Sequence, residues 1–331
     1  LIPTILMGAT LPALTRFVTR SLSELRGRVA ALYAINSAGA VVGVLLADWW
    51  WIPGLGLEVT LYLGAAMSLL VGLVANATSR AHEQGPAGTS GTTATGPISW
   101  ETPEPFTPRQ LRAAVWAIGV SGFVAMLYEV VWTRLLGLAI GSNTHAYSLM
   151  LATFIGGIAT GSWLVHRWRA TGKTLLGFAV AELALAATLA VSVWFYDLIP
   201  WWLSRLAGLL ARTPGSYPLY ELLQGALCVA VMFIPTVCLG TTLPLASRIA
   251  TAELGRAGGS VGRVFAVNTL GTVLGAVLTG LVLGMLVRIL ASTLQVAGQI
   301  VANQTGLASA SMFDPTQGDQ GAVVGRFLTM A

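Results

Sequence analysis

Charged residues are scarce in this chain. Lys, Arg, Asp and Glu together make up 9% of its 331 residues, whereas hydrophobic residues make up 55%. A soluble globular domain usually carries about 25% charged residues. The mean hydropathy is +0.75, and a chain of this composition cannot cover its surface in water. The composition excludes an ordinary soluble protein and predicts an integral membrane protein.

Residues that bind metals or act as nucleophiles are also rare. The only cysteines, Cys228 and Cys238, lie in one apolar run without metal-ligand spacing, and there are three histidines. No dinucleotide-binding glycine motif, P-loop, HExxH or GxSxG motif occurs. We therefore expect no catalytic residue, no metal and no cofactor in this chain. The net charge of +5 comes from arginines in short loops between apolar runs, which argues against a nucleic-acid partner.

Apolar runs dominate what is present. They are long and lack the alternating pattern of membrane β-strands, and each is near the roughly 20 residues that a helix needs to cross a bilayer. The sequence predicts an all-α polytopic membrane protein with about eight transmembrane helices and lipid as its main partner. The expected spans are 1–15, 29–51, 58–76, 112–133, 144–165, 174–196, 219–242 and 261–284.

Residues 77–110 interrupt this pattern. They are rich in Gly, Pro, Ser and Thr and predict a flexible linker. Basic residues mark the side of the membrane on which each loop lies, because cytoplasmic loops carry an excess of Lys and Arg. Thirteen basic residues lie in segments predicted to be on the same side of the membrane as this linker, and three lie in loops on the opposite side. We expect a multi-pass protein of the bacterial inner membrane with the linker in the cytoplasm.

The chain contains an internal repeat. Residues 8–43 align with 240–275 without a gap, and 14 of the 36 positions are identical. An even number of predicted crossings separates the copies, so they have the same orientation, as in the parallel repeats of transporters. Helices precede the second copy from Arg112 onward, and we expect further helices ahead of Leu1.

Four segments follow from these patterns. They are the first-repeat membrane helices, truncated at the N-terminus (1–76), the linker (77–110), a second membrane bundle (111–283) and a tail of different character (284–331).

Polar residues inside apolar spans are the candidate binding residues, because burying them in lipid is costly. Glu129, which follows Tyr128, and Glu182 are the preferred binding or ion-pairing acids. Asn36 and Asn268 are equivalent in the repeat, and each amide is expected to bond across helices near the repeat axis. Asp48 and Glu221 fall near span ends, where solvation is cheap, and we interpret both as structural. His145 and Tyr147 begin a span, and we expect a role at the edge of the loop.

Glycines with a spacing of four residues predict close helix packing, since the missing side chain lets backbones approach. The alternative is that they form a moving interface. The pairs are Gly39 and Gly43, Gly157 and Gly161, and Gly271 and Gly275.

Two resemblances follow from longer motifs. SGFVAMLYEVVWTRLLGLAIGSNTHAYSLMLATFIGGIATGSWL at 121–164, GATLPALTRF at 8–17 and the asparagine-glycine motif within 27–57 resemble the integral-membrane spermidine synthase-like family, over about 1–283. This resemblance implies polyamine binding or transport, with polyamine as partner. It also implies a soluble aminopropyltransferase domain that is missing from this chain, so no catalytic residue is carried across.

From about Gly280 the chain is similar to the R subunit of the flagellar, or type III, export gate. Asn303-Gln304-Thr305-Gly306-Leu307 and Met312-Phe313-Asp314-Pro315 carry that likeness. The joining of two families leads to the hypothesis of a chimera, natural or arising in sequence assembly. Three functions stay open: a polyamine-related membrane region, an export-gate component, or a non-transporting membrane anchor.

Overall fold

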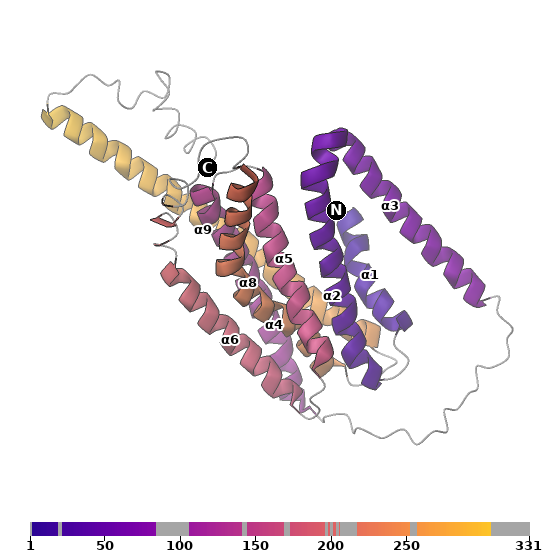
Figure 1. Ribbon diagram of the computed structural model, residues 1–331. Coiled ribbons are helices and arrows are strands. Elements are labelled where there is room, and N and C mark those ends of the chain that lie inside the picture. Colours follow the sequence, from indigo (N-terminus) through magenta and orange to yellow (C-terminus); the bar gives the residue numbers. More distant parts are fainter. Residues whose placement is uncertain are drawn as a thin grey trace.

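The computed structural model describes a helical protein. It covers residues 2–18, 22–83, 106–140, 144–168, 173–195, 198, 201–202, 205, 217–251 and 257–305. Every regular secondary-structure element within these ranges is a helix, so the expected all-α architecture is confirmed. Figure 1 shows the helices in a slanted bundle, with one helix from the first part of the chain splayed from its side.

The first part of the chain forms that side. Its elements are α1 (Ile2–Val18), α2 (Leu22–Leu46), a short π-helix η1 (Ala47–Trp51) and α3 (Ile52–Glu83). The chain reverses near Gly56, the one described residue with a positive φ, at 82°. Glycine suits this conformation because it has no Cβ to clash with the following carbonyl. Figure 1 shows α3 leaving α2 at this turn and running away from the bundle.

The second part forms the packed bundle. Its helices are α4 (Pro108–Ile140), α5 (Thr144–Arg167), α6 (Thr174–Phe195), α8 (Tyr217–Ala250) and α9 (Ala257–Thr305). The start of α4 is a capping box. The Thr107 hydroxyl accepts from the Gln110 backbone N–H at 3.3 Å, while the Gln110 Oε1 accepts from the Thr107 backbone N–H at 2.8 Å.

Six helical segments of the described chain are long and apolar enough to cross a membrane. The first, Arg28–Thr78, contains 51 residues and includes the reversal at Gly56. The others are Pro108–Gly137, Thr144–Arg167, Thr174–Phe195, Leu219–Ala250 and Gly259–Leu286. A polytopic membrane protein follows, as predicted. Of the predicted linker, 77–83 belongs to α3, and residues 84–105 lie outside the described ranges.

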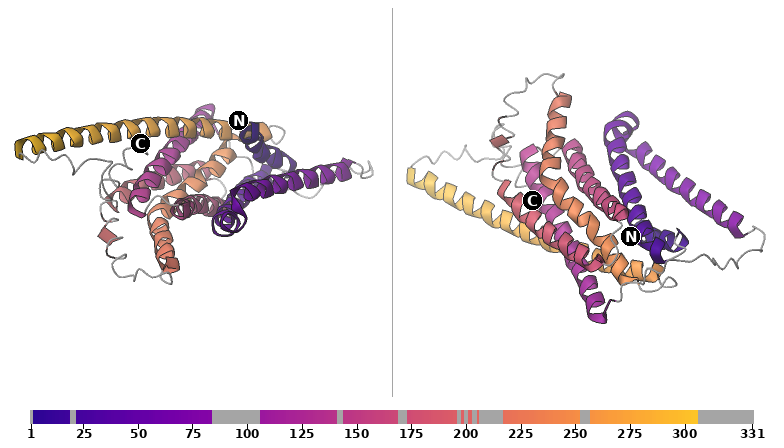
Figure 2. Two further views of the ribbon diagram at one scale, coloured as in Figure 1. Left: turned by 90° about the horizontal axis from the view of Figure 1, so that it is seen from above. Right: turned by 60° about the horizontal axis from the view of Figure 1, so that its bottom comes forward.

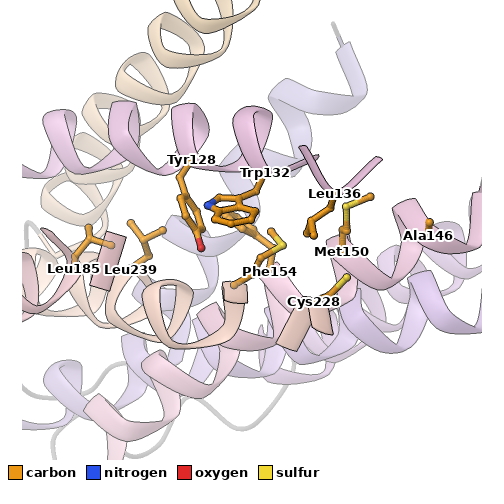
Figure 3. Packing of buried hydrophobic residues seen from close by; sticks show 10 residues of the cluster. Tyr128, Trp132, Leu136, Ala146, Met150, Phe154, Leu185, Cys228 and Leu239 are labelled. Carbon is orange, nitrogen blue, oxygen red and sulfur yellow. The ribbon is translucent and has the colours of Figure 1, made fainter. Parts of the chain in front are cut away.

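The main hydrophobic cluster joins α4, α5, α6 and α8. Figure 3 shows Tyr128 and Trp132 of α4 directed toward Phe154 of α5, with Met150 and Cys228 further along the cluster. The rings of Tyr128 and Trp132 meet edge to face, with centroids 6.0 Å apart. Aromatic and sulfur-containing side chains therefore fill the centre of the bundle.

The two repeat copies meet each other through equivalent residues. Val29 and its counterpart Val261 are both fully buried in one small cluster. Tyr33 and its counterpart Phe265 pack edge to face, with ring centroids 5.8 Å apart. Contacts between identical positions of two related units are the mark of a two-fold arrangement.

The longest helix, α9, has 49 residues. At 1.5 Å per residue it spans roughly 74 Å, about two and a half times the hydrocarbon thickness of a bilayer. Its first half packs on α4, α1 and α8. Both views of Figure 2 show the second half projecting beyond the bundle.

Candidate functional site

A polar cluster lies inside the bundle where α4, α6 and α8 meet. Glu182 shares a face of α6 with the buried residues Phe178 and Leu185. Its carboxyl group lies beside Ser121 of α4, and the Ser121 hydroxyl is 3.5 Å from Thr242 Oγ1 of α8. Ser121 and Thr242 are each 2% exposed, so the cluster is enclosed by helices.

One oxygen of this cluster has no partner. Glu182 Oε1 is buried and accepts no hydrogen bond in the described structure. The Thr242 hydroxyl already donates to the Leu239 carbonyl at 2.8 Å, which leaves its oxygen to accept from Ser121. A buried carboxylate without enough donors is costly in a membrane interior, and this cost favours uptake of a proton or a small cation.

Tyr128 lies deep in the same bundle and is 4% exposed. Its hydroxyl donates to the Val231 carbonyl of α8 at 3.2 Å, and Ser192 of α6 lies nearby. The ring packs in the hydrophobic cluster (Figure 3). The Tyr128 hydroxyl thus links α4 to α8, and it is separate from the Glu182 oxygen that lacks a partner.

Glu129 is half-buried. It follows Ser121 by eight positions on α4, about 12 Å along a helix. Since Ser121 is the α4 residue that meets Glu182, the two glutamates lie at different depths of the bundle. The structure does not bring them together in one acidic pair.

The two repeat asparagines have different surroundings. Asn268 of α9 faces α4 so closely that a Cβ added at Gly122 would overlap its backbone carbonyl, with its side-chain Oδ1 only 2.7 Å away. Asn36 of α2 is exposed on the outside of the bundle. Identical positions of the repeat therefore have one covered amide and one uncovered amide.

Glycines line the two closest helix crossings. At the α5–α8 crossing, Gly157 lies against Thr236, while Gly161 lies against Val237 and Gly240. The Ser162 hydroxyl adds a hydrogen bond to the Gly240 carbonyl at 2.8 Å. At the α4–α9 crossing, Gly271 lies against the carbonyl of Gly119 and Gly275 against that of Phe123. A Cβ at Gly157 would collide with the Thr236 side chain, and a Cβ at Gly161, Gly271 or Gly275 would collide with backbone. These crossings therefore depend on glycine.

Gly39 and Gly43 do not take part in such a crossing. A Cβ added at either would meet no atom within 4 Å, and both are exposed. They are the repeat equivalents of Gly271 and Gly275, which α4 covers.

Asp48 and His145 form a polar contact that the sequence analysis did not predict, because it placed each residue separately at the end of a span. The π-helix η1 turns Asp48 inward, where it is 4% exposed. Its Oδ2 lies 2.7 Å from Nδ1 of His145, the second residue of α5. The Trp49 ring lies beside the imidazole, with centroids 5.3 Å apart. The sequence signal was an acid and a histidine at span ends on the same membrane side, but pairing them required knowing that α2 packs on α5.

At the opposite end of α5, Arg248 closes the helix terminus. Its guanidinium donates to the Val165 carbonyl at 2.8 Å. Cations are favourable at the C-terminal end of a helix, where carbonyls lack partners. This contact holds α8 to α5 at the basic side of the membrane.

Comparison with known proteins gives one family match. The model described as "Bacterial export proteins, family 1" matches residues 200–331, less than half of the chain. Neither a curated protein nor a solved structure matches the chain. The matched stretch contains α8 and α9 and the tail beyond them.

The match corrects the sequence interpretation. The assignment to the spermidine synthase-like family is wrong, and with it go the polyamine partner and the missing aminopropyltransferase domain, because the family found is the export family. The export likeness also begins about 80 residues before Gly280, where the tail resemblance began.

The error has a physical source. Apolar helices with glycine, serine and asparagine at contact positions recur among unrelated membrane proteins, because lipid and close packing impose the same demands on all of them. Such motifs report packing more than ancestry. The chain is a multi-pass protein of the bacterial inner membrane, and residues 200–331 are similar to bacterial export proteins of family 1.

Proposed function

We propose that this protein is a membrane component of a bacterial export apparatus, of the flagellar or type III gate class. The observation that carries this proposal is the family match over residues 200–331. The motif residues Met312-Phe313-Asp314-Pro315 fall inside that stretch. Its partners are then the other membrane subunits of an export gate.

Co-purification tests this role. The full chain carries an affinity tag and is produced in a bacterial host together with the P and Q subunits of a flagellar export gate. In mild detergent both subunits are expected to elute with the full chain. A variant without residues 284–331 is expected to lose them, whereas a variant without residues 84–105 retains them. Elution of the tagged chain alone, or retention by both deletion variants, contradicts the proposal.

Within this function, we propose that Glu182 is the residue at which the bundle binds a proton or a small cation. The supporting observations are its Oε1 atom, buried without a partner, and the enclosed hydroxyl groups of Ser121 and Thr242. An ionisable group inside a membrane bundle typically marks an ion or proton pathway. Glu129 serves as the comparison, since it is an acid in the same bundle at a different depth.

Substitution separates the two acids. Glu182→Gln is expected to leave the chain folded and assembled with its partners but to abolish export of a reporter substrate. Glu129→Gln is expected to retain most of the export. Equal export by Glu182→Gln and the unmodified chain would rule out a role for this carboxylate.

The repeat supports a finer architecture. We propose that the chain crosses the membrane about eight times and that its two copies are related by an axis along the membrane normal. The 51-residue apolar segment supplies two of these crossings and α1 a short one. The contacts of Val29 with Val261 and of Tyr33 with Phe265 support this axis. The proposed segments are 1–76, 77–110, 111–283 and 284–331; a natural fusion or an assembly artefact remains the hypothesis for the joining of the tail.

A further inference from the structure

Three helix faces are covered in one copy of the repeat and open in the other. The first is the α9 face of Asn268, Gly271 and Gly275, which α4 covers. Its counterpart on α2 consists of Asn36, Gly39 and Gly43, all exposed. The same two sequence patterns therefore end in opposite environments.

The second face involves α8. Gly240 lies against the backbone of Ile158 in α5. Its repeat counterpart is Gly8 of α1, which is exposed and has no atom within 4 Å of an added Cβ. Here again the second copy is covered and the first is not.

The third face shows the opposite pattern, because here the first copy is the one that is covered. On α2, Ala34 and Ser37 are buried, and a Cβ added at Gly156 of α5 would lie 3.9 Å from Val41. The counterparts on α9 are Ala266, Thr269 and Val273, and all three are exposed. The first copy is covered at this face and the second is open.

One additional pair of helices would cover all three open faces. In the covered positions the occupants are always α4 or α5. A second helix pair placed by the repeat relation would put an α4-like helix on α2 and an α5-like helix on both α1 and α9. The exposed Asn36 adds a chemical reason, because an amide at membrane depth is stabilised by a partner across a helix interface.

We propose that the open faces of α1, α2 and α9 form one docking surface for a membrane helix pair that resembles α4 and α5. That pair carries glycines at the spacing of Gly119 and Gly122 in α4 and of Gly157 and Gly161 in α5. A second copy of this chain does not fit the role, since its own α4 is already covered by its own α9. The proposal rests on the repeat axis proposed above and is independent of the export role.

Cysteine cross-linking in membranes tests the docking. The background chain carries Cys228→Ala and Cys238→Ala, and the probe is a tagged hairpin of residues 108–167 produced with it. Asn36→Cys in the chain and Gly122→Cys in the hairpin repeat the close approach of Gly122 to Asn268. Val273→Cys with hairpin Gly156→Cys repeats that of Gly156 to Val41. Each pair is expected to form a disulfide adduct at about tenfold the level of a Gly72→Cys control on α3, as one stabilising helix contact predicts.

A second variant tests the same contact if the separate hairpin fails to insert into the membrane. Residues 108–232 are joined directly to Leu1, which continues the repeat in register and supplies the same helices within one chain. An internal disulfide between the added Gly122→Cys and Asn36→Cys is expected. Absence of the disulfide in this variant shows that lipid covers the surface and overturns the proposal. Cross-linking of Asn36→Cys to itself, in the absence of the hairpin, identifies a second copy as the occupant and also overturns it. Loss of export-subunit binding leaves these results unchanged, so the two proposals fail separately.

Discussion

The two glycine pairs of the repeat have the same sequence spacing, but one pair is covered by another helix and the other is exposed. Gly271 and Gly275 lie against the backbone of α4, while Gly39 and Gly43 face outward. The comparison teaches that a glycine motif specifies a surface that can accept a helix, but not whether the chain itself supplies that helix. Packing partners, and not the motif, decide what each glycine does.

Replacement of the covered and uncovered glycines gives the largest expected contrast. Gly271→Leu would drive a side chain into the carbonyl of Gly119, and overpacking of this kind costs about 3 kcal/mol of unfolding free energy. The matched change Gly39→Leu meets open space and is expected to stay within about 0.5 kcal/mol. Unfolding of each variant in mixed detergent micelles measures both. Equal destabilisation by the two changes would remove the distinction between the copies.

The turn that separates α3 from α2 gives the next effect. Gly56 has φ 82° and no neighbour within 4 Å of an added Cβ. Gly56→Ala therefore costs only its backbone strain, about 1–2 kcal/mol. Gly54→Ala, in the adjacent helical turn with equal space, is the control and is expected to be neutral or slightly stabilising. Thermal unfolding compares them, and a neutral Gly56→Ala would mean that the turn relaxes freely.

The contact between η1, which follows α2, and α5 can be weakened at Asp48. Asp48→Asn changes a charge-assisted hydrogen bond to His145 into a neutral one, with an expected loss of about 1 kcal/mol. Glu58→Gln, an exposed acid in α3, is the control and should have little effect. Limited proteolysis of residues 84–105 and thermal unfolding would report whether α2 then separates from α5. No change in either measurement would show that apolar packing alone holds α2 in place.

The smallest effect is expected at a single hydroxyl. Ser162→Ala removes the hydrogen bond to the Gly240 carbonyl, and such interhelical bonds contribute about 0.6 kcal/mol in membrane proteins. The control Ser68→Ala removes a hydroxyl that bonds only to Gly64 of its own helix, on the exposed α3. Unfolding in detergent should separate the two by a small margin. A larger loss at Ser68 would mean that α3 is not the weakly packed region.

Sequence patterns predicted the helices well and their neighbours poorly. The apolar runs are local features, and the helices follow them closely. The capping box of Thr107 and Gln110, which starts α4, lies within the predicted linker and was not recognised from the sequence. Asn36 and Asn268 carry the same local signal, yet one is covered and the other exposed. Ser121 and Thr242 gave no signal at all, because a hydroxyl in an apolar run matters only when a carboxylate from another helix meets it.

The amino-acid sequence by itself determined the membrane environment and the helical class. With so little charge, lipid must surround the chain, and in lipid a backbone is stable only when its polar groups bond within the helix. Only the tertiary structure decided which glycines meet backbone, that Asp48 meets His145, and that Glu182 retains an oxygen without a partner. These depend on contacts between helices far apart in the sequence, and no local pattern encodes which of two similar faces will be covered.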